Sequence, residues 1–239
     1  MKSRYRKTFA GFLWVVLNPI VMFGVQGLVF RQFLRIPVDK YFTFLLSGLL
    51  PWIFIVQSME MCTSIFVTHS QVLKSFHLKP LVLLFAQLLD NLINFLAAFC
   101  LIFIFLLLRL EPGAEIGGLL FVPLAVAVLL VGVTGICWLL ATSQVFLRDT
   151  RFMVQFGSAV MFFLTPIFYP REMVPAEFRW LSDLNPVYRL IEPFRIAVYD
   201  FRWEAFQASL VKGALVASCF VLAASLLWYR RRSSLYVHL

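Results

Sequence analysis

The sequence is poor in charge and lacks the short motifs that mark many enzymes. Only 14% of its 239 residues are charged, whereas a soluble domain carries about a quarter. It contains no G-x-x-x-x-G-K-[S/T] phosphate loop, no H-E-x-x-H helix and no G-x-S-x-G elbow. Its acidic residues form no cluster at metal-ligand spacing. These absences argue against an enzyme and against a proton- or sodium-coupled carrier.

Cysteine and histidine are also scarce and scattered. Each of the four cysteines lies alone inside an apolar run, without C-x-x-C spacing, and the three histidines form no ligand motif. We expect the thiols to behave as small buried hydrophobic groups rather than as disulfides or metal ligands. The sequence therefore predicts no metal and no cofactor bound by this chain. The residues are Cys62, Cys100, Cys137, Cys219, His69, His77 and His238.

Long apolar runs dominate the chain. Apolar residues make up 62% of it and its mean hydropathy is +0.88, which indicates an all-α integral membrane protein. A spanning helix needs about 20 apolar residues, and we expect six spans, at about 9–30, 41–68, 81–108, 117–147, 152–169 and 205–229. The net charge of +9 does not predict nucleic-acid binding, because the basic residues lie at the ends of the apolar runs.

The basic residues also predict the orientation. Six spans place both termini on one side of the membrane. If that side is cytoplasmic, 11 of the 21 Lys and Arg residues fall in short inner segments and nine fall in longer outer loops, together with most of the acidic residues. This moderate excess of positive charge on the inside is typical of cytoplasmic loops. Both termini are therefore predicted to be cytoplasmic. The inner residues are Lys2, Arg4, Arg6, Lys7, Lys74, Lys79, Arg148, Arg151, Arg230, Arg231 and Arg232.

Two carboxyl groups lie inside predicted spans. Glu60 falls in the second span and Asp90 in the third, close to Asn91 and Asn94. An ionisable group in a span is expensive and is a candidate for function. The alternative is that neighbouring groups or water satisfy both carboxylates without any functional role, and the sequence leaves this open.

The inner segment "HSQVLKSFHLKP", residues 69–80, has an amphipathic pattern. Val72, Leu73 and Phe76 fall on one face of a helix. Such a helix can lie along the membrane surface or dock into a groove of a cytoplasmic partner. An ordinary basic loop fits the pattern equally well.

The stretch "FFLTPIFYP", residues 162–170, breaks a helix at membrane depth. Pro166 and Pro170 remove backbone donors, and Tyr169 lies between them. Non-helical backbone at this depth is tolerated where it is buried in protein or lines a cavity. Short re-entrant or interfacial helices are expected to follow, with apolar faces at Phe178 and Leu181 and at Leu190, Phe194 and Val198. The alternative is a plain connecting loop.

Phenylalanine is abundant, with 27 residues. Phe152, Phe156 and Phe163 share one face of the fifth predicted span. Such a face can stack against sugar rings and line a channel. It can equally face lipid or pack against another helix.

Six stretches in order, "RYRKTFAGFLWVVLNP", "LLSGLLPW", "SQVLKSFHLKP", "FLRDTRFMVQF", "FFLTPIFYP" and "LNPVYRLIEPFR", together resemble a known family. It is the membrane subunit of the type-2 ABC exporters of O-antigen, capsular polysaccharide or teichoic acid. The resemblance runs from about Arg4 to the last span.

The resemblance implies a single permease domain over residues 1–239 that forms a homodimer with six transmembrane helices per subunit. Two copies of a separate ATP-binding subunit, holding ATP and Mg²⁺, would dock on its cytoplasmic face. Residues 70–80 would form a coupling helix, with Leu73, Lys74 and Phe76 as contacts. The segment beginning at Pro166, Tyr169 and Pro170 would form re-entrant gate helices at the outer mouth.

The implied function is ATP-driven export of a lipid-linked polysaccharide across the bacterial inner membrane. We expect Arg4, Arg6 and Lys7 to contact lipid headgroups or the pyrophosphate of the carrier. Family members usually carry an amphipathic helix before this basic element, and here it begins close to Met1. The alternatives are a type-2 ABC exporter of a small lipid or drug, an intramembrane enzyme of lipid-linked sugar metabolism, and a scaffold subunit.

Overall fold

The computed structural model describes residues 21, 25, 38–76, 78–108 and 116–238. All the regular secondary structure in these residues is helical. Within the described residues, four helices are long and apolar enough to cross a membrane, so the protein is a multi-pass membrane protein. They are α3 (Tyr41–Thr63), α6 (Pro80–Leu108), α7 (Val122–Phe146), which continues the short 3₁₀ helix η2 (Ile116–Phe121), and α11 (Trp203–His238).

Shorter helices connect the long ones. Between α3 and α6 lie α4 (Ile65–Thr68) and α5 (Ser70–Phe76). After α7 come α8 (Thr150–Leu164), the 3₁₀ turns η3 (Arg171–Met173) and η4 (Ala176–Phe178), α9 (Arg179–Leu184) and α10 (Pro186–Val198). The expected short helices after the proline break are therefore present.

The observed helices correct several predicted span boundaries. The second span breaks at Ser64 into α3 and α4, and the last extends to residue 238. The fifth ends at Leu164 instead of 169, because Pro166 cannot donate to the preceding turn and forces Thr165 into an extended conformation (φ −92°, ψ 126°). With 15 residues, α8 is shorter than a plain crossing. The predicted first span, 9–30, lies outside the described residues, so six spans are not established.

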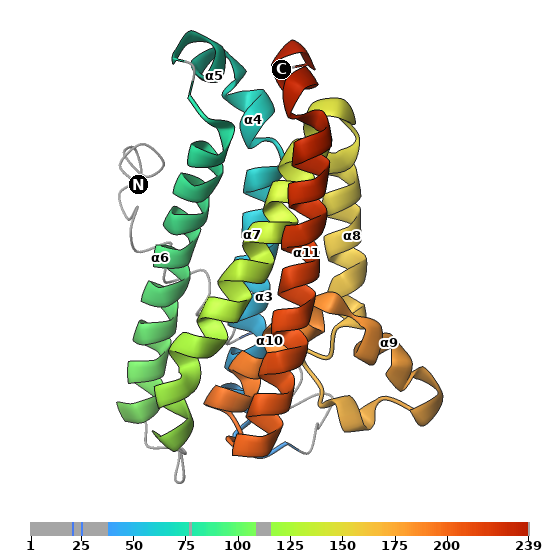
Figure 1. Ribbon diagram of the computed structural model, residues 1–239. Coiled ribbons are helices and arrows are strands. Elements are labelled where there is room, and N and C mark those ends of the chain that lie inside the picture. The colour runs from blue at the N-terminus through green and yellow to red at the C-terminus, as the bar shows by residue number, and fades with distance from the viewer. Residues whose placement is uncertain (1–20, 22–24, 26–37, 77, 109–115, 239) are drawn as a thin grey trace.

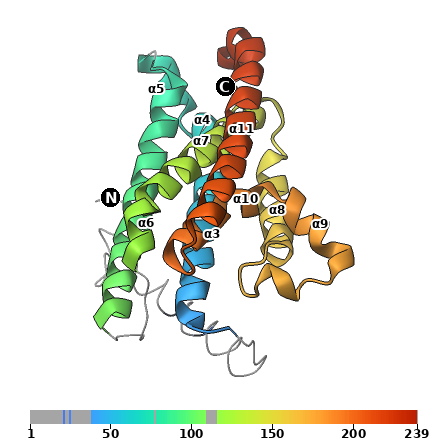
Figure 2. The same ribbon diagram turned by 60° about the horizontal axis from the view of Figure 1, so that its bottom comes forward.

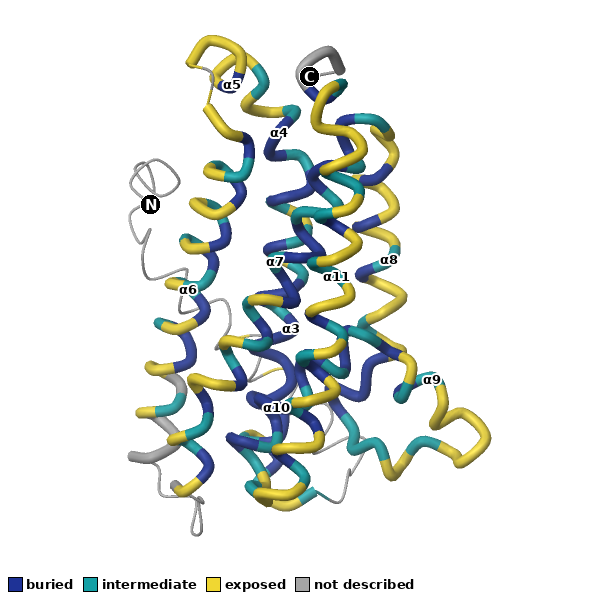
Figure 3. The backbone as a smooth tube through the Cα atoms, viewed as in Figure 1, coloured by how far each residue is buried: buried dark blue, intermediate teal, exposed yellow. Residues whose placement is uncertain are grey.

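Helix α3 is the most enclosed of the long helices, with 67% of its most apolar window buried, against 17% for α11. It packs against α6, α7, α8 and α10, while α11 packs along α7 (Figure 1). Buried residues follow the inner sides of these helices, and exposed residues cover α5, α9 and the outward sides of α6 and α11 (Figure 3). The apolar outer sides are what a lipid environment requires.

The two ends of the bundle differ. One end carries α5, the turn between α7 and α8, and the C-terminal end of α11 (Figure 1). The other carries α10, η2 and the first turn of α3, with α9 projecting to one side (Figures 1 and 2). Lys74, Lys79, Arg148, Arg151 and Arg230 all belong to segments at the first end, where Asp149 is the one acidic residue among those described. The first end therefore carries net positive charge, whereas the arginines at the other end are matched by acidic residues.

Candidate functional site

The proline break forms a compact, fully buried segment, which we call the break segment (Thr165–Phe168). Its Thr165 hydroxyl donates to the Met161 carbonyl (2.7 Å) and accepts from Asn185 Nδ2 (2.8 Å). The three carbonyls that follow have no helical N–H partner, because the backbone is non-helical here and Pro170 has no N–H to donate to the Pro166 carbonyl. Each buried carbonyl therefore needs a donor from elsewhere in the fold.

Arg195 of α10 supplies two of those donors. Its Nη1 donates to the Pro166 carbonyl (2.6 Å) and its Nη2 to the Ile167 carbonyl (3.1 Å). The guanidinium lies 4.5 Å from the centre of the Phe44 ring, a cation–π distance. Only 8% of Arg195 is exposed, so the contact is dry.

Tyr41, in the first turn of α3, supplies the third side-chain donor to the carbonyls of the break segment. Its hydroxyl donates to the Phe168 carbonyl (3.1 Å), and Tyr169 turns back so that its own hydroxyl donates to the Phe163 carbonyl (3.0 Å). Pro170 then precedes η3 in an extended conformation. Thus the three residues expected to mark the break, Pro166, Tyr169 and Pro170, lie in one turn that joins α8 to the short helices.

Helix α10 presents a buried face to the bundle, and Asn185 fixes its start. The Asn185 side-chain oxygen accepts from the backbone N–H of Val187 (2.9 Å) and Tyr188 (3.2 Å), an N-cap. The predicted apolar face of Leu190, Phe194 and Val198 is confirmed as buried.

The α9 segment is held by ion pairs and exposes large apolar side chains. Arg171 and Arg189 both contact the Asp183 carboxylate, at 2.6 and 3.1 Å, and Arg189 also contacts Glu192 at 3.0 Å. The expected pair Phe178 and Leu181 is not buried together: Phe178, at the N-cap of α9, is 52% exposed, whereas Leu181 is half-buried. The exposed large apolar residues of η3, η4 and α9 are Met173, Phe178, Trp180 and Leu184.

The aromatic face of α8 points away from the described bundle. Phe152, Phe156 and Phe163 are 68%, 73% and 76% exposed, while Val154 and Ser158 on the opposite side are buried. The three rings share one side of the helix, as their spacing predicts. This face is available to a lipid, a second protein chain or a sugar.

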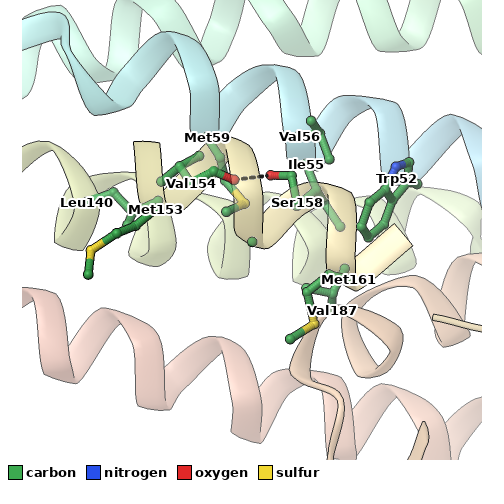
Figure 4. Close-up of a pocket in the computed structure, with 11 residues that line it drawn as sticks. Trp52, Ile55, Val56, Met59, Leu140, Met153, Val154, Ser158, Met161 and Val187 are labelled. Carbon is green, nitrogen blue, oxygen red and sulfur yellow. Dashed lines mark hydrogen bonds between the residues drawn. The ribbon is translucent and has the colours of Figure 1, made fainter. Parts of the chain in front are cut away.

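A separate apolar pocket of about 220 Å³ lies beside α8. Its walls come from α3, α7, α8 and the start of α10 (Figure 4). The Ser158 hydroxyl in its wall is already used, since it donates to the Val154 carbonyl at 2.7 Å (Figure 4). The pocket thus suits hydrocarbon better than sugar. The lining residues are Trp52, Ile55, Val56, Met59, Leu140, Met153, Val154, Gly157, Ser158, Met161 and Val187.

Helix α5 separates the residues expected to act together as contacts. Leu73 is fully buried, whereas Phe76 is 73% exposed and Lys74 is exposed. The predicted apolar face of Val72, Leu73 and Phe76 is therefore split, because Leu73 packs into the chain itself. Leu73 holds α5 on the bundle, and Phe76 and Lys74 remain open to a partner.

The two intramembrane carboxyl groups flank a polar contact between α3 and α6. Asn91 Nδ2 donates to Ser58 Oγ (3.2 Å), and Gln87 Nε2 donates to Asn91 Oδ1 (3.1 Å). Glu60 is exposed, Asp90 is partly buried, and neither forms an ion pair with any residue in the described ranges. Their functional role stays open.

Other expected site residues cannot be placed. Arg4, Arg6 and Lys7 lie outside the described residues. Within the described ranges, no group of three or more His, Cys, Asp or Glu side chains could hold a metal ion.

Sequence reasoning missed Arg195, Tyr41 and Asn185. The prolines in the sequence could have indicated that such residues exist. A proline leaves a backbone carbonyl without its N–H donor, and at membrane depth that carbonyl needs a hydrogen bond from another group.

The chain is similar to proteins of known role. The family described as "ABC-2 type transporter" matches residues 1–199. An O-antigen export system permease protein (RfbA) of Klebsiella pneumoniae is 27% identical over 197 residues, covering 82% of this chain and 75% of the relative. An RfbA of Myxococcus xanthus is 28% identical over 235 residues, covering 97% and 89% respectively.

Proposed function

Since the chain belongs to the ABC-2 type transporter family, we propose that the cargo it exports is a polysaccharide, carried on a lipid. The chain is the permease of such an exporter, a transport subunit that works with an ATP-binding subunit. The observation that carries the choice of cargo is the similarity to O-antigen export permeases over most of the chain.

The aromatic face of α8 supports a glycan path. Sugar rings have apolar C–H faces, and aromatic rings bury such surfaces well. We assign Phe152, Phe156 and Phe163 to the lining of the path, where a long glycan would slide past rings rather than bind one tight site. In a homodimer, the corresponding faces of two copies would enclose the path.

The net positive charge at the first end of the bundle supports a cytoplasmic position for α5 and for the C-terminal end of α11 in a bacterial inner membrane. We place the N-terminus on the same side. Two copies of the ATP-binding subunit, each holding ATP and Mg²⁺, would dock there. Phe76 and Lys74 would contact the partner, and Leu73 would transmit its displacement to the bundle. The basic residues Arg4, Arg6 and Lys7 would attract anionic headgroups or the pyrophosphate of the lipid carrier.

At the opposite end, α9 and α10 would form short re-entrant helices around the outer mouth. The break segment fits that role because all four of its residues are buried and the carbonyls of its last three residues accept from side chains. Irregular backbone is tolerated at membrane depth under these conditions. Pro166, Tyr169 and Pro170 would then turn the chain back to shape the exit.

Co-purification with the partner tests this function. The tagged chain would be expressed with candidate ATP-binding subunits, purified in mild detergent and assayed for ATPase activity with and without lipid-linked glycan. We expect a stable complex whose ATPase responds to the glycan. Phe76→Ala should abolish the response at normal abundance, because it removes an exposed contact of α5. Leu73→Ala should lower abundance instead, since it empties a fully buried site.

Ile104→Ala is the control, because Ile104 is a 52% exposed apolar residue near the end of α6 that lies away from α5. It should leave the complex and the response unchanged. A chain that purifies alone, with no ATP-binding subunit under any condition, would overturn the proposal.

The apolar pocket supports a second candidate, export of a small lipid or drug. Its volume of about 220 Å³ and its hydrocarbon walls fit part of such a molecule. The same ATPase assay separates the two: stimulation by a free lipid and none by lipid-linked glycan would favour the second candidate.

A further inference from the structure

We propose that Arg195 is a positioning residue that latches the exit shut in the resting protein. The Arg195 latch comprises the guanidinium, the Pro166 and Ile167 carbonyls that it binds, and the α3 residues Phe44 and Gly48 against which it lies. That this end of the molecule is the exit rests on the proposed function. The latch itself rests on the geometry.

The first observation is that one side chain joins three elements. From α10, Arg195 donates to both break-segment carbonyls, at 2.6 and 3.1 Å, and stacks on Phe44 of α3 at 4.5 Å. The break segment is the direct continuation of α8. Movement of α8, α10 or α3 relative to the other two must therefore disturb this contact.

The second observation is that the cation is buried without a carboxylate. Arg195 forms no ion pair with the described residues, and its Nε has no hydrogen-bond partner. A neutral amide would be enough to satisfy one carbonyl. No carboxylate of the described residues contacts the guanidinium, and Glu192 and Glu172 favour its charge only from a distance. A buried charge whose direct contacts are carbonyl dipoles and a ring is stable in one arrangement and costly once those contacts separate. The guanidinium therefore either keeps all of these contacts or leaves them and is hydrated by water. These two alternatives are the two states that a gate requires.

The third observation is the space that α3 leaves for the guanidinium. A methyl group at Gly48 would overlap Arg195 Nη2 and lie 3.3 Å from the Ile167 carbonyl oxygen. Gly48 is helical, so no unusual backbone angle calls for glycine there. The absent side chain instead allows the guanidinium to lie against the α3 backbone.

The fourth observation is where α3 leads. Its first half carries Tyr41, Phe44 and Gly48 at the latch, and its other end continues through α4 into α5, which Leu73 anchors. The same helix thus reaches both the break segment and the expected partner contact. A displacement that begins at α5 has a direct route to the latch.

The test measures leak through the full-length chain in a bacterial inner membrane, without glycan or ATP-binding subunit. Entry of o-nitrophenyl galactoside into cells that lack lactose permease but contain β-galactosidase reports the leak. We expect wild type to be sealed and Arg195→Gln to admit the compound several-fold faster at equal membrane abundance. Gly48→Ala should also leak, because it displaces the guanidinium without removing it. The double variant should leak no more than Arg195→Gln alone, since both changes remove one contact.

Arg202→Gln is the matched control. Arg202 lies beyond α10 at the same end of the bundle, but it is exposed and pairs with the Asp200 carboxylate (3.3 Å). It should stay sealed. An Arg195→Gln protein that inserts normally and does not leak would overturn the latch. If Arg195→Gln fails to accumulate, Gly48→Ala becomes the deciding variant. A Gly48→Ala protein that accumulates normally and does not leak rejects a gating role, and so does a Gly48→Ala protein that fails to accumulate.

The latch and the proposed function can fail separately in these experiments. A sealed Arg195→Gln variant in a chain that still restores glycan export would reject the latch alone. Leaky variants of a chain that never associates with an ATP-binding subunit would keep the latch and reject the exporter.

Discussion

At the scale of single residues, close helix packing depends on glycines that have no room for a side chain. Gly135 of α7 faces α11, where an added Cβ would lie 2.7 Å from the Val221 nitrogen and 2.8 Å from the Phe220 carbonyl carbon. Those are backbone atoms and cannot move aside without moving the helix. By contrast, an added Cβ at Gly157 of α8 meets nothing within 4 Å.

Gly135→Ala should therefore push α11 away from α7 and destabilise the protein by about 1–3 kcal/mol, the usual cost of overpacking. Gly157→Ala should be neutral or stabilising by about 0.5–1 kcal/mol, because alanine is the better helix former. The thermal midpoint of each purified variant in one detergent measures the difference. An unchanged midpoint for Gly135→Ala would contradict the observed α7–α11 contact.

At the scale of elements, the two sides of α8 have different surroundings. One side packs on α3 and α7 and lines the apolar pocket, and the other presents three exposed rings. Its short length follows from the prolines, and its end is fixed by side chains from α3 and α10. A helix built this way can present rings to a path while its end stays attached to the bundle.

Replacing Phe152, Phe156 and Phe163 together by alanine should reduce surface glycan without changing complex assembly. Each aromatic contact is worth roughly 0.5–1.5 kcal/mol, and about 1.4 kcal/mol is a factor of ten, so we expect about a tenfold loss or more. The readout is the amount and chain length of exported polysaccharide in a strain that depends on this chain. The matched control replaces Leu215, Leu222 and Leu226, exposed on α11, and full export by the Phe variant would remove α8 from the path.

At the scale of the whole molecule, the sequence predicts the apolar framework better than its polar contacts. Apolar runs locate α3, α6, α7 and α11, and the prolines locate the end of the fifth helix to within a few residues. These features depend on local composition and on backbone chemistry. The helical faces of α8 and α10 follow from periodicity for the same reason.

The partners of Arg195 and the burial of Leu73 could not be predicted in this way. Arg195 binds carbonyls 28 and 29 residues away, and nothing in "EPFR" distinguishes it from an arginine at the membrane surface. Leu73 and Phe76 look alike in a helical pattern, and only the packing of α5 shows which one is buried. Both are tertiary facts that periodicity does not encode.

The most direct test of the exporter is ATP-dependent glycan transport by the reconstituted complex. The chain and its ATP-binding subunit would be placed in proteoliposomes with lipid-linked glycan, and arrival of glycan on the far side would be detected by an enclosed glycan-cleaving enzyme. The account predicts transport with ATP and Mg²⁺, none with a non-hydrolysable ATP analogue, and none with Phe76→Ala. ATP hydrolysis by an intact complex with no glycan crossing the membrane would contradict it.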